Sequence, residues 1–221
     1  MPDIACRGLL FDLDGVLVDS TPAVARVWTK WAIAHGFDPV ETVRRAHGRP
    51  SIATIRDLLP NADYAAENQV VLRGEIEDTE GVVALPGARE LLNSLPPGSW
   101  AVVTSCSRPL AEVRLKTAGL PYPRQVVTCD DVRHGKPDPE PYQKGAFLLG
   151  VPASECVVFE DAPAGIRAGK AAGAIVVALR TTAPDMELEK AGADWILAGY
   201  DNLVVVSDDH GSGAIHLRLS N

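Results

Sequence analysis

The sequence lacks any unbroken apolar run of about 18 residues, the length that a helix needs to cross a bilayer. Its opening letters, MPDIACRGLL, also lack a charged leader followed by a long apolar stretch and a small-residue cleavage site. We therefore expect no membrane partner and no secretory signal, and we predict a cytoplasmic protein.

Basic residues are fewer than acidic ones, with 21 Lys and Arg against 29 Asp and Glu and a formal net charge of -8. Nucleic-acid backbones are bound by basic patches, and this chain does not have them. The composition therefore argues against a nucleic-acid partner. Any phosphate group must be bound locally, by a metal ion or by a few well-placed cations.

Paired cysteines are missing as well. The four cysteines are scattered, with no CxxC pair and no closely spaced histidine, at Cys6, Cys106, Cys129 and Cys156. We therefore expect small buried apolar side chains in a reducing compartment rather than zinc ligands or disulfide partners.

The chain has the composition of an ordinary soluble globular protein, with 46% hydrophobic and 23% charged residues. Its 221 residues suffice for one core with an insertion or for two modest domains. Length alone leaves both possibilities open.

Beyond residue 84 the chain alternates short β-branched runs with helical stretches. The helical stretches have proline near their starts and glycine past their ends, as at Pro86, Pro109, Gly119 and Gly150. The runs between them are almost continuously apolar, which is typical of strands buried on both faces of a parallel sheet: WAVVTS, QVVTCDD, ECVVFED, AIVVALR and DWILAG. With CRGLLFDLD as the first strand, the pattern predicts an α/β fold, an open parallel sheet with helices on both faces. The tail, LVVVSDDHGSGAIHLRLS, predicts two short strands around a Gly-rich turn.

Residues 19–82 interrupt this alternation and are predicted to be entirely helical. Pro22 opens a helix with one apolar and aromatic face, made of Val24, Val27, Trp28, Trp31 and His35, which we expect to pack in the core of this segment. Further helices are predicted from Asp38 onwards and over 52–59 and 62–76. We therefore predict an α/β core domain of residues 1–18 and 83–221, and a helical cap domain of residues 19–82 over the end of the first strand.

Acidic side chains follow the ends of several predicted strands. Ligands bind outside the carboxyl ends of the strands in an open α/β sheet, so residues distant in sequence meet at one edge. The first strand ends in the carboxylates Asp12 and Asp14, and a later one ends in Glu160 and Asp161. This edge also receives two hydroxyls and an amine, from Thr104, Ser105 and Lys136.

Carboxylates gathered in this way repel one another, by roughly 4 kcal/mol for each pair about 4 Å apart at an effective dielectric of about 20. They need a counter-charge. An oxygen-only ligand set without His or Cys selects a hard cation, and Mg²⁺ fits because it takes one or two carboxylates together with water and substrate phosphate.

Asp12 and Asp14 are two residues apart. If the strand persists that far, both project toward the same side, and Gly15 then permits a sharp turn. One carboxylate can attack phosphorus, while the other, kept protonated by the charge of the first, can donate a proton to the leaving oxygen.

Four segments together resemble the motifs of the haloacid dehalogenase superfamily of phosphohydrolases. FDLDGVLVDS is similar to its first motif, VVTS to the second, GKPDPEPY to the third and VVFEDAPAGIRAGKAAG to the fourth, in the same order. The resemblance covers essentially the whole chain. It implies a Rossmann-like parallel sheet core with an inserted all-helical cap, and within the superfamily it is strongest to sugar phosphatases and glycerol-3-phosphate phosphatases.

The resemblance also implies a role for each motif residue. Asp12 would be the nucleophile that forms an aspartyl-phosphate, and Asp14 the general acid/base whose backbone carbonyl also contacts the metal. Asp161 would bind Mg²⁺, with Glu160 as a direct or water-mediated second ligand.

The remaining motif residues would bind the phosphoryl group. Thr104 would bond a phosphate oxygen with Ser105 beside it, and Lys136 would neutralise Asp12 and the phosphoryl group. One departure is Cys106, where relatives often have glycine.

We therefore expect a Mg²⁺-dependent phosphatase that acts on a small sugar or polyol phosphate. Arg49 and His47 in the cap are candidates for contact with the substrate. A phosphomutase resembling β-phosphoglucomutase is the alternative, and a phosphosugar-binding protein without catalysis is a further one. The identity of the sugar and the oligomeric state do not follow from the sequence.

Overall fold

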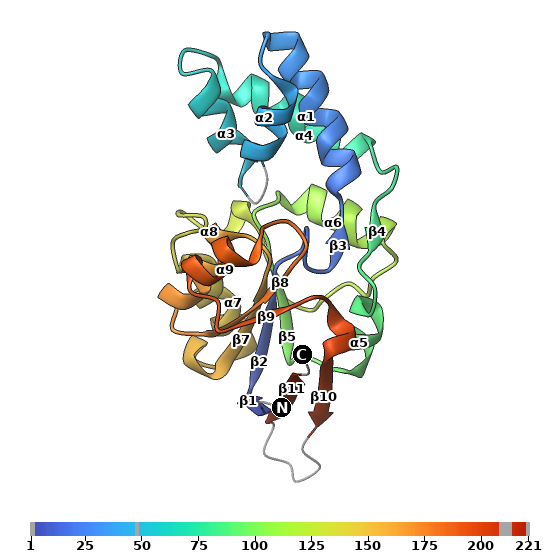
Figure 1. The fold of residues 1–221 in the computed structure, drawn as a ribbon, viewed down its shortest axis with the longest axis vertical. Coiled ribbons are helices and arrows are strands. Elements are labelled where there is room, and N and C mark those ends of the chain that lie inside the picture. Colours follow the sequence, from blue (N-terminus) through green and yellow to red (C-terminus); the bar gives the residue numbers. More distant parts are fainter. Residues whose placement is uncertain (1–2, 47–48, 208–213, 220–221) are drawn as a thin grey trace.

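The computed structural model describes residues 3–46, 49–207 and 214–219. Its centre is a six-stranded parallel sheet in the order β6-β5-β2-β7-β8-β9 (Figure 1). The strands are β2 (Gly8–Phe11), β5 (Trp100–Val103), β6 (Val126–Val127), β7 (Cys156–Glu160), β8 (Ile175–Leu179) and β9 (Trp195–Leu197). The predicted parallel sheet is therefore confirmed, with the first strand of the sheet at its middle.

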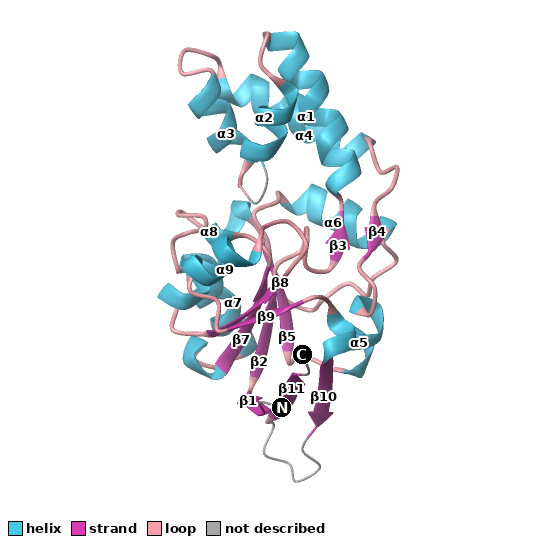
Figure 2. Cartoon of the chain, viewed as in Figure 1, coloured by secondary structure: helices cyan, strands magenta, loops and turns pink. Residues whose placement is uncertain are grey.

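Helices cover both faces of this sheet (Figure 2). They are α5 (Ala88–Ser94), α6 (Arg108–Thr117), α7 (Glu140–Leu149), α8 (Pro163–Ala171) and α9 (Asp185–Ala191). Alternate residues of β2 point to opposite faces: Leu9 and Phe11 pack in the core that contains α5 and α6, and Leu10 packs in the core with α7 to α9. β2 is buried on both faces, which explains its continuous apolar sequence.

A second sheet is antiparallel and joins the two ends of the described chain. It has the order β1-β11-β10, with β1 (Asp3–Cys6), β10 (Leu203–Ser207) and β11 (Ile215–Leu219). The two strands predicted in the tail are thus present. The predicted first strand of the parallel sheet is present as β2, and the sequence analysis missed β1, which the chain forms in the antiparallel sheet before it enters β2.

Four helices stand over the carboxyl end of the parallel sheet (Figure 1). They are α1 (Thr21–His35), α2 (Pro39–Ala46), α3 (Ser51–Leu58) and α4 (Tyr64–Glu77). They have an apolar core of their own, which includes Val27, Trp28, Trp31, Ile55 and Val71. The predicted aromatic face of α1 forms much of this core.

A short antiparallel ribbon connects these helices to the rest of the chain. β3 (Val18–Asp19) pairs with β4 (Val83–Ala84) where the chain leaves the sheet and where it returns. The sequence did not predict the ribbon, since two-residue strands have no periodicity. The ribbon lies at the boundary predicted near residues 18 and 83, and we keep the division into a core and a cap domain as a proposal.

Three short 3-10 helices complete the described chain, at Cys129–Asp131, Ala153–Glu155 and Tyr200–Asn202. None of the helices in the described ranges has both the length and the apolar character required to span a bilayer.

Candidate active site

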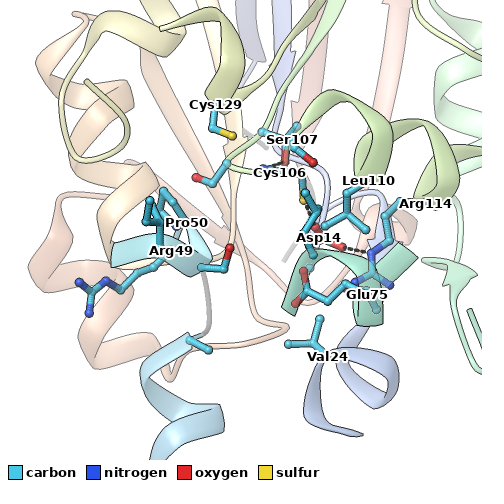
Figure 3. Close-up of a pocket in the computed structure, with 18 of the residues that line it drawn as sticks. Asp14, Val24, Arg49, Pro50, Glu75, Cys106, Ser107, Leu110, Arg114 and Cys129 are labelled. Carbon is cyan, nitrogen blue, oxygen red and sulfur yellow. Dashed lines mark hydrogen bonds and ion pairs between the residues drawn. The ribbon is translucent and has the colours of Figure 1, made fainter. Parts of the chain in front are cut away.

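A cavity of about 240 Å³ lies between the carboxyl end of the parallel sheet and helices α1 to α4 (Figure 3). Its floor includes Asp12 and Asp14 after β2, Thr104 and Ser105 after β5, and Asp161 after β7. Its opposite wall comes from α1, α3 and α4. The parallel topology therefore brings these motif residues to one edge, as the strand-end rule predicts.

Lys136 is the cation nearest to Asp12. Its Nζ lies 2.9 Å from Asp12 Oδ1 and 2.6 Å from Glu160 Oε1, and only 3% of its side chain is exposed. Burial by itself lowers the pKa of Lys136, but the two carboxylates outweigh burial and raise it above the ordinary value. Lys136 is therefore a permanently charged bridge between Asp12 and Glu160.

The Glu160 carboxylate is surrounded by protein donors. Oε1 accepts from Lys136 and from the Tyr142 hydroxyl at 2.6 Å each, and Oε2 accepts from the backbone N–H groups of Asp161 at 3.0 Å and Ala162 at 3.3 Å. A Cβ at Gly165 would lie 1.6 Å from Oε1, so only glycine leaves room for this carboxylate. Each Glu160 oxygen already accepts two hydrogen bonds, which favours a role in holding Lys136 over direct metal binding.

Asp161 lies beside the Gly15 turn. Thr182 Oγ1 donates to Asp161 Oδ2. Gly15 has φ +79°, and a Cβ there would meet Asp161 Oδ2 at 2.0 Å, so glycine is required both for the turn and for the close approach.

Asp12, Glu160 and Asp161 form a cluster in which one oxygen of each lies within 4.8 Å of the others. Burial raises the pKa of Asp12 to about 7, against the lowering effect of Lys136. Burial, with Glu160 and Asp12 next in order, raises the pKa of Asp161 well above its usual range. Three buried carboxyls facing one lysine lack positive charge, and a divalent cation with oxygen ligands fits this deficit.

The Asp14 carboxyl lies apart from this cluster. β2 ends at Phe11, so the condition under which both aspartates would project to one side, a strand that persists to Asp14, is not met. The Cys106 thiol donates to Asp14 Oδ2 at 2.9 Å, and Arg114 Nε lies 3.3 Å from Oδ1. Asp14 still lines the cavity, because the turn that includes Gly15 directs it there.

Thr104 and Ser105 lie at the start of the loop that leads into α6. Thr104 is buried, and its Oγ1 accepts from the Cys106 N–H at 3.1 Å, which leaves the hydroxyl hydrogen for an acceptor in the cavity. Ser105 lines the cavity beside it.

Arg49 is at the edge of the cavity, but its guanidinium is directed away (Figure 3). It forms an ion pair with Asp57 at 2.9 Å, and 39% of its side chain is exposed. The structure therefore does not bring Arg49 together with the other predicted site residues. His47 lies outside the described residues.

Two buried charged residues of the cavity escaped the sequence analysis. Arg114 of α6 is only 1% exposed, and Glu75 of α4 is 8% exposed. Burial raises the pKa of Glu75 to about 7, while Arg114 lowers it and Asp14 raises it. Neither residue belongs to a motif, and in helices that carry several charged residues each looks like an ordinary surface charge.

The family model of haloacid dehalogenase-like hydrolases matches residues 6–173. Hexitol phosphatase A of Escherichia coli is 44% identical over 93% of this chain and 97% of its own length. The 2-deoxyglucose-6-phosphate phosphatase 2 of Saccharomyces cerevisiae is 36% identical over 99% of this chain and 98% of its own.

Among solved structures, a hydrolase from Pseudomonas syringae aligns with a TM-score of 0.70 and 28% identity, over 87% of this chain and 93% of its own. The matched region contains the first motif, the loop after β5, Lys136 and Asp161, in the order that the resemblance predicted. The chain belongs to the haloacid dehalogenase-like hydrolase family.

Proposed function

We propose that this protein is a Mg²⁺-dependent phosphatase that hydrolyses a small sugar or polyol phosphate monoester through an aspartyl-phosphate on Asp12. The observation that carries the proposal is the buried Asp12 carboxylate, 2.9 Å from Lys136 and clustered with Glu160 and Asp161 at the floor of a cavity. The names of the two relatives, a hexitol phosphatase and a 2-deoxyglucose-6-phosphate phosphatase, support this substrate class.

In the first step an Asp12 oxygen attacks phosphorus, and the bond from phosphorus to the leaving oxygen breaks. Asp14 donates a proton to that oxygen, so the sugar or polyol leaves as a neutral alcohol. Asp14 lines the cavity beside Cys106, where we expect it to meet the leaving oxygen. In the second step water attacks phosphorus, Asp14 takes its proton, and the bond from Asp12 to phosphorus breaks.

The other residues hold the phosphoryl group in place. Lys136 neutralises the Asp12 carboxylate and the oxygens transferred to it, while Thr104 and Ser105 offer hydroxyl donors from the loop after β5. Lys136 is held by its ion pairs with Asp12 and Glu160, and Thr104 by its hydrogen bond with the Cys106 N–H, so these two need little reorganisation during the reaction.

Asp12 and Asp161 would hold Mg²⁺, together with the Asp14 backbone carbonyl. The Glu160 carboxylate would act through water or by positioning Lys136, because both of its oxygens have protein donors. When bound, the ion supplies positive charge that offsets the negative charge on the phosphoryl oxygens.

The test is a panel of phosphorylated metabolites assayed for phosphate release with Mg²⁺, including hexitol phosphates, hexose 6-phosphates, hexose 1-phosphates and glycerol 3-phosphate. We expect release from several esters, and loss of at least 99% of it in Asp12→Asn, in line with the roughly 10²-fold or larger effects of removing a nucleophile. Isomerised sugar phosphate without phosphate release would instead identify a phosphomutase. Tight binding without any turnover would identify a binding protein.

A further inference from the structure

One face of α4 forms part of the cavity wall opposite the phosphoryl site. It presents Asn68, Leu72 and Glu75, at the i, i+4 and i+7 positions of the helix. Glu75 is the ionisable group on this face and is 8% exposed. A carboxyl buried to this extent is costly unless a partner or a ligand uses it. Trp28 donates one side-chain hydrogen bond to Glu75, and the two carboxyl oxygens can accept further ones.

Glu75 lies next to Asp14 and Arg114 (Figure 3). Arg114 Nε is 3.3 Å from Asp14 Oδ1, and its Nε and Nη1 are buried without a hydrogen bond. The guanidinium therefore serves as a charge between two carboxyls, one from the sheet edge and one from α4. This arrangement places Glu75 beside the group that protonates the leaving oxygen.

The cavity offers little to a second anionic group on the substrate. Of its described lining residues, Arg49 and Arg114 are the cationic ones. Arg49 is paired with Asp57, and Arg114 is inaccessible beside Asp14. Val24 and Leu72 add apolar surface near Glu75. The wall opposite the phosphoryl site therefore suits a neutral leaving group that carries hydrogen-bond donors.

We propose that Glu75 is a specificity-determining residue that accepts a hydrogen bond from a hydroxyl on the carbon next to the phosphorylated carbon. This hydroxyl is the donor nearest to the scissile oxygen in a polyol phosphate. Glu75 is the acceptor beside Asp14, the residue that protonates that oxygen. The inference rests on the proposed phosphatase function and narrows its substrate class to esters with a vicinal hydroxyl, as in polyol phosphates. Pyranose 6-phosphates carry the ring oxygen at that carbon and fall outside the narrowed class. Hydrogen bonds to a charged acceptor change binding by roughly tenfold to a hundredfold.

Three matched esters test this inference in the full-length enzyme with Mg²⁺: 1,2-propanediol 1-phosphate, 1,3-propanediol phosphate and propyl phosphate. We expect kcat/KM for the first to exceed that for the other two by about tenfold or more. In Glu75→Leu this preference should fall below about threefold, and in the isosteric Glu75→Gln it should fall several-fold. Glu77→Gln, an exposed change on the same helix, should keep the full preference.

Each preference is the ratio of two kcat/KM values measured on one enzyme preparation. A fraction of unfolded protein lowers both values equally and therefore does not change the ratio. Equal hydrolysis of the three esters by the unchanged enzyme would overturn the role of Glu75 and leave the phosphatase function standing. A preference that survives in Glu75→Leu, while all three rates fall together, would also overturn it and make Glu75 a counter-charge for Arg114. Absence of hydrolysis for these esters and for the whole metabolite panel would refute the proposed function itself.

Discussion

Replacement of Lys136 by methionine removes the cation between two buried carboxylates and keeps an unbranched apolar side chain. The two ion pairs, at 2.9 and 2.6 Å, have Coulomb energies of about 6 kcal/mol each at an effective dielectric of 20. The cost of burying the charges offsets much of this, and loss of one partner of a buried ion pair costs about 3–5 kcal/mol. We expect the free energy of unfolding to fall by that amount at pH 8.

The loss should depend on pH in a defined direction. The pKa of Asp12 is raised by burial to about 7 in the folded protein, above its ordinary value of 3.8. Between these two pH values the folded state therefore binds more protons than the unfolded state. Ionisation of Asp12 as pH rises destabilises the folded state. At pH 5 Asp12 is largely protonated with or without Lys136, so the difference between Lys136→Met and the unchanged protein should shrink.

Urea unfolding followed by circular dichroism measures this difference at pH 5 and pH 8, with EDTA present so that no bound cation replaces the lysine. Lys170→Met is the matched control, because Lys170 pairs with Asp194 at 2.7 Å but is 37% exposed. Its loss should stay below about 1 kcal/mol at both pH values. A Lys136→Met loss as small as that of the control, or one that does not grow with pH, would refute the assignment of Lys136 as the essential counter-charge.

Three further predictions concern the metal, the glycine that makes room for Glu160, and the buried acid of α4. Chelation by EDTA should abolish phosphate release and added Mg²⁺ should restore it, since Asp12, Glu160 and Asp161 together lack positive charge; activity indifferent to the chelator would contradict the metal site. Gly165→Ala should lower kcat about tenfold or more and the free energy of unfolding by about 1–3 kcal/mol, because its Cβ would lie 1.6 Å from Glu160 Oε1. Unchanged kinetics would show that catalysis does not depend on the position of the Glu160 carboxylate. For Glu75→Gln, the stability relative to the unchanged protein should rise with pH by up to about 3 kcal/mol between pH 4.5 and 8, because the pKa of Glu75 is raised by burial to about 7 and its ionisation destabilises the folded state. Unfolding curves at several pH values measure this rise, and a flat difference would contradict it.

The sequence by itself determined the sheet and the floor of the site. The strands β2, β5, β7 and β8 are buried on both faces, so their apolar runs are continuous and easy to recognise. Because parallel strands end at one edge, Asp12, Lys136 and Asp161 could be assigned to one place without coordinates. Local rules suffice for Asp12 and Asp161, since each directly follows a strand, whereas Lys136 lies in the loop between β6 and α7 and was assigned to the same edge because that loop can reach it.

Only the tertiary structure decided the side of the cavity that faces the leaving group. Asp14 leaves the line of β2 because the strand ends at Phe11, and its partners, Cys106 and Arg114, come from a distant helix and the loop before it. Glu75 becomes a buried acid only because α4 packs against α6. Charged residues on amphipathic helices look alike in sequence, and the packing of one helix on another determines which of them loses contact with water and enters the site.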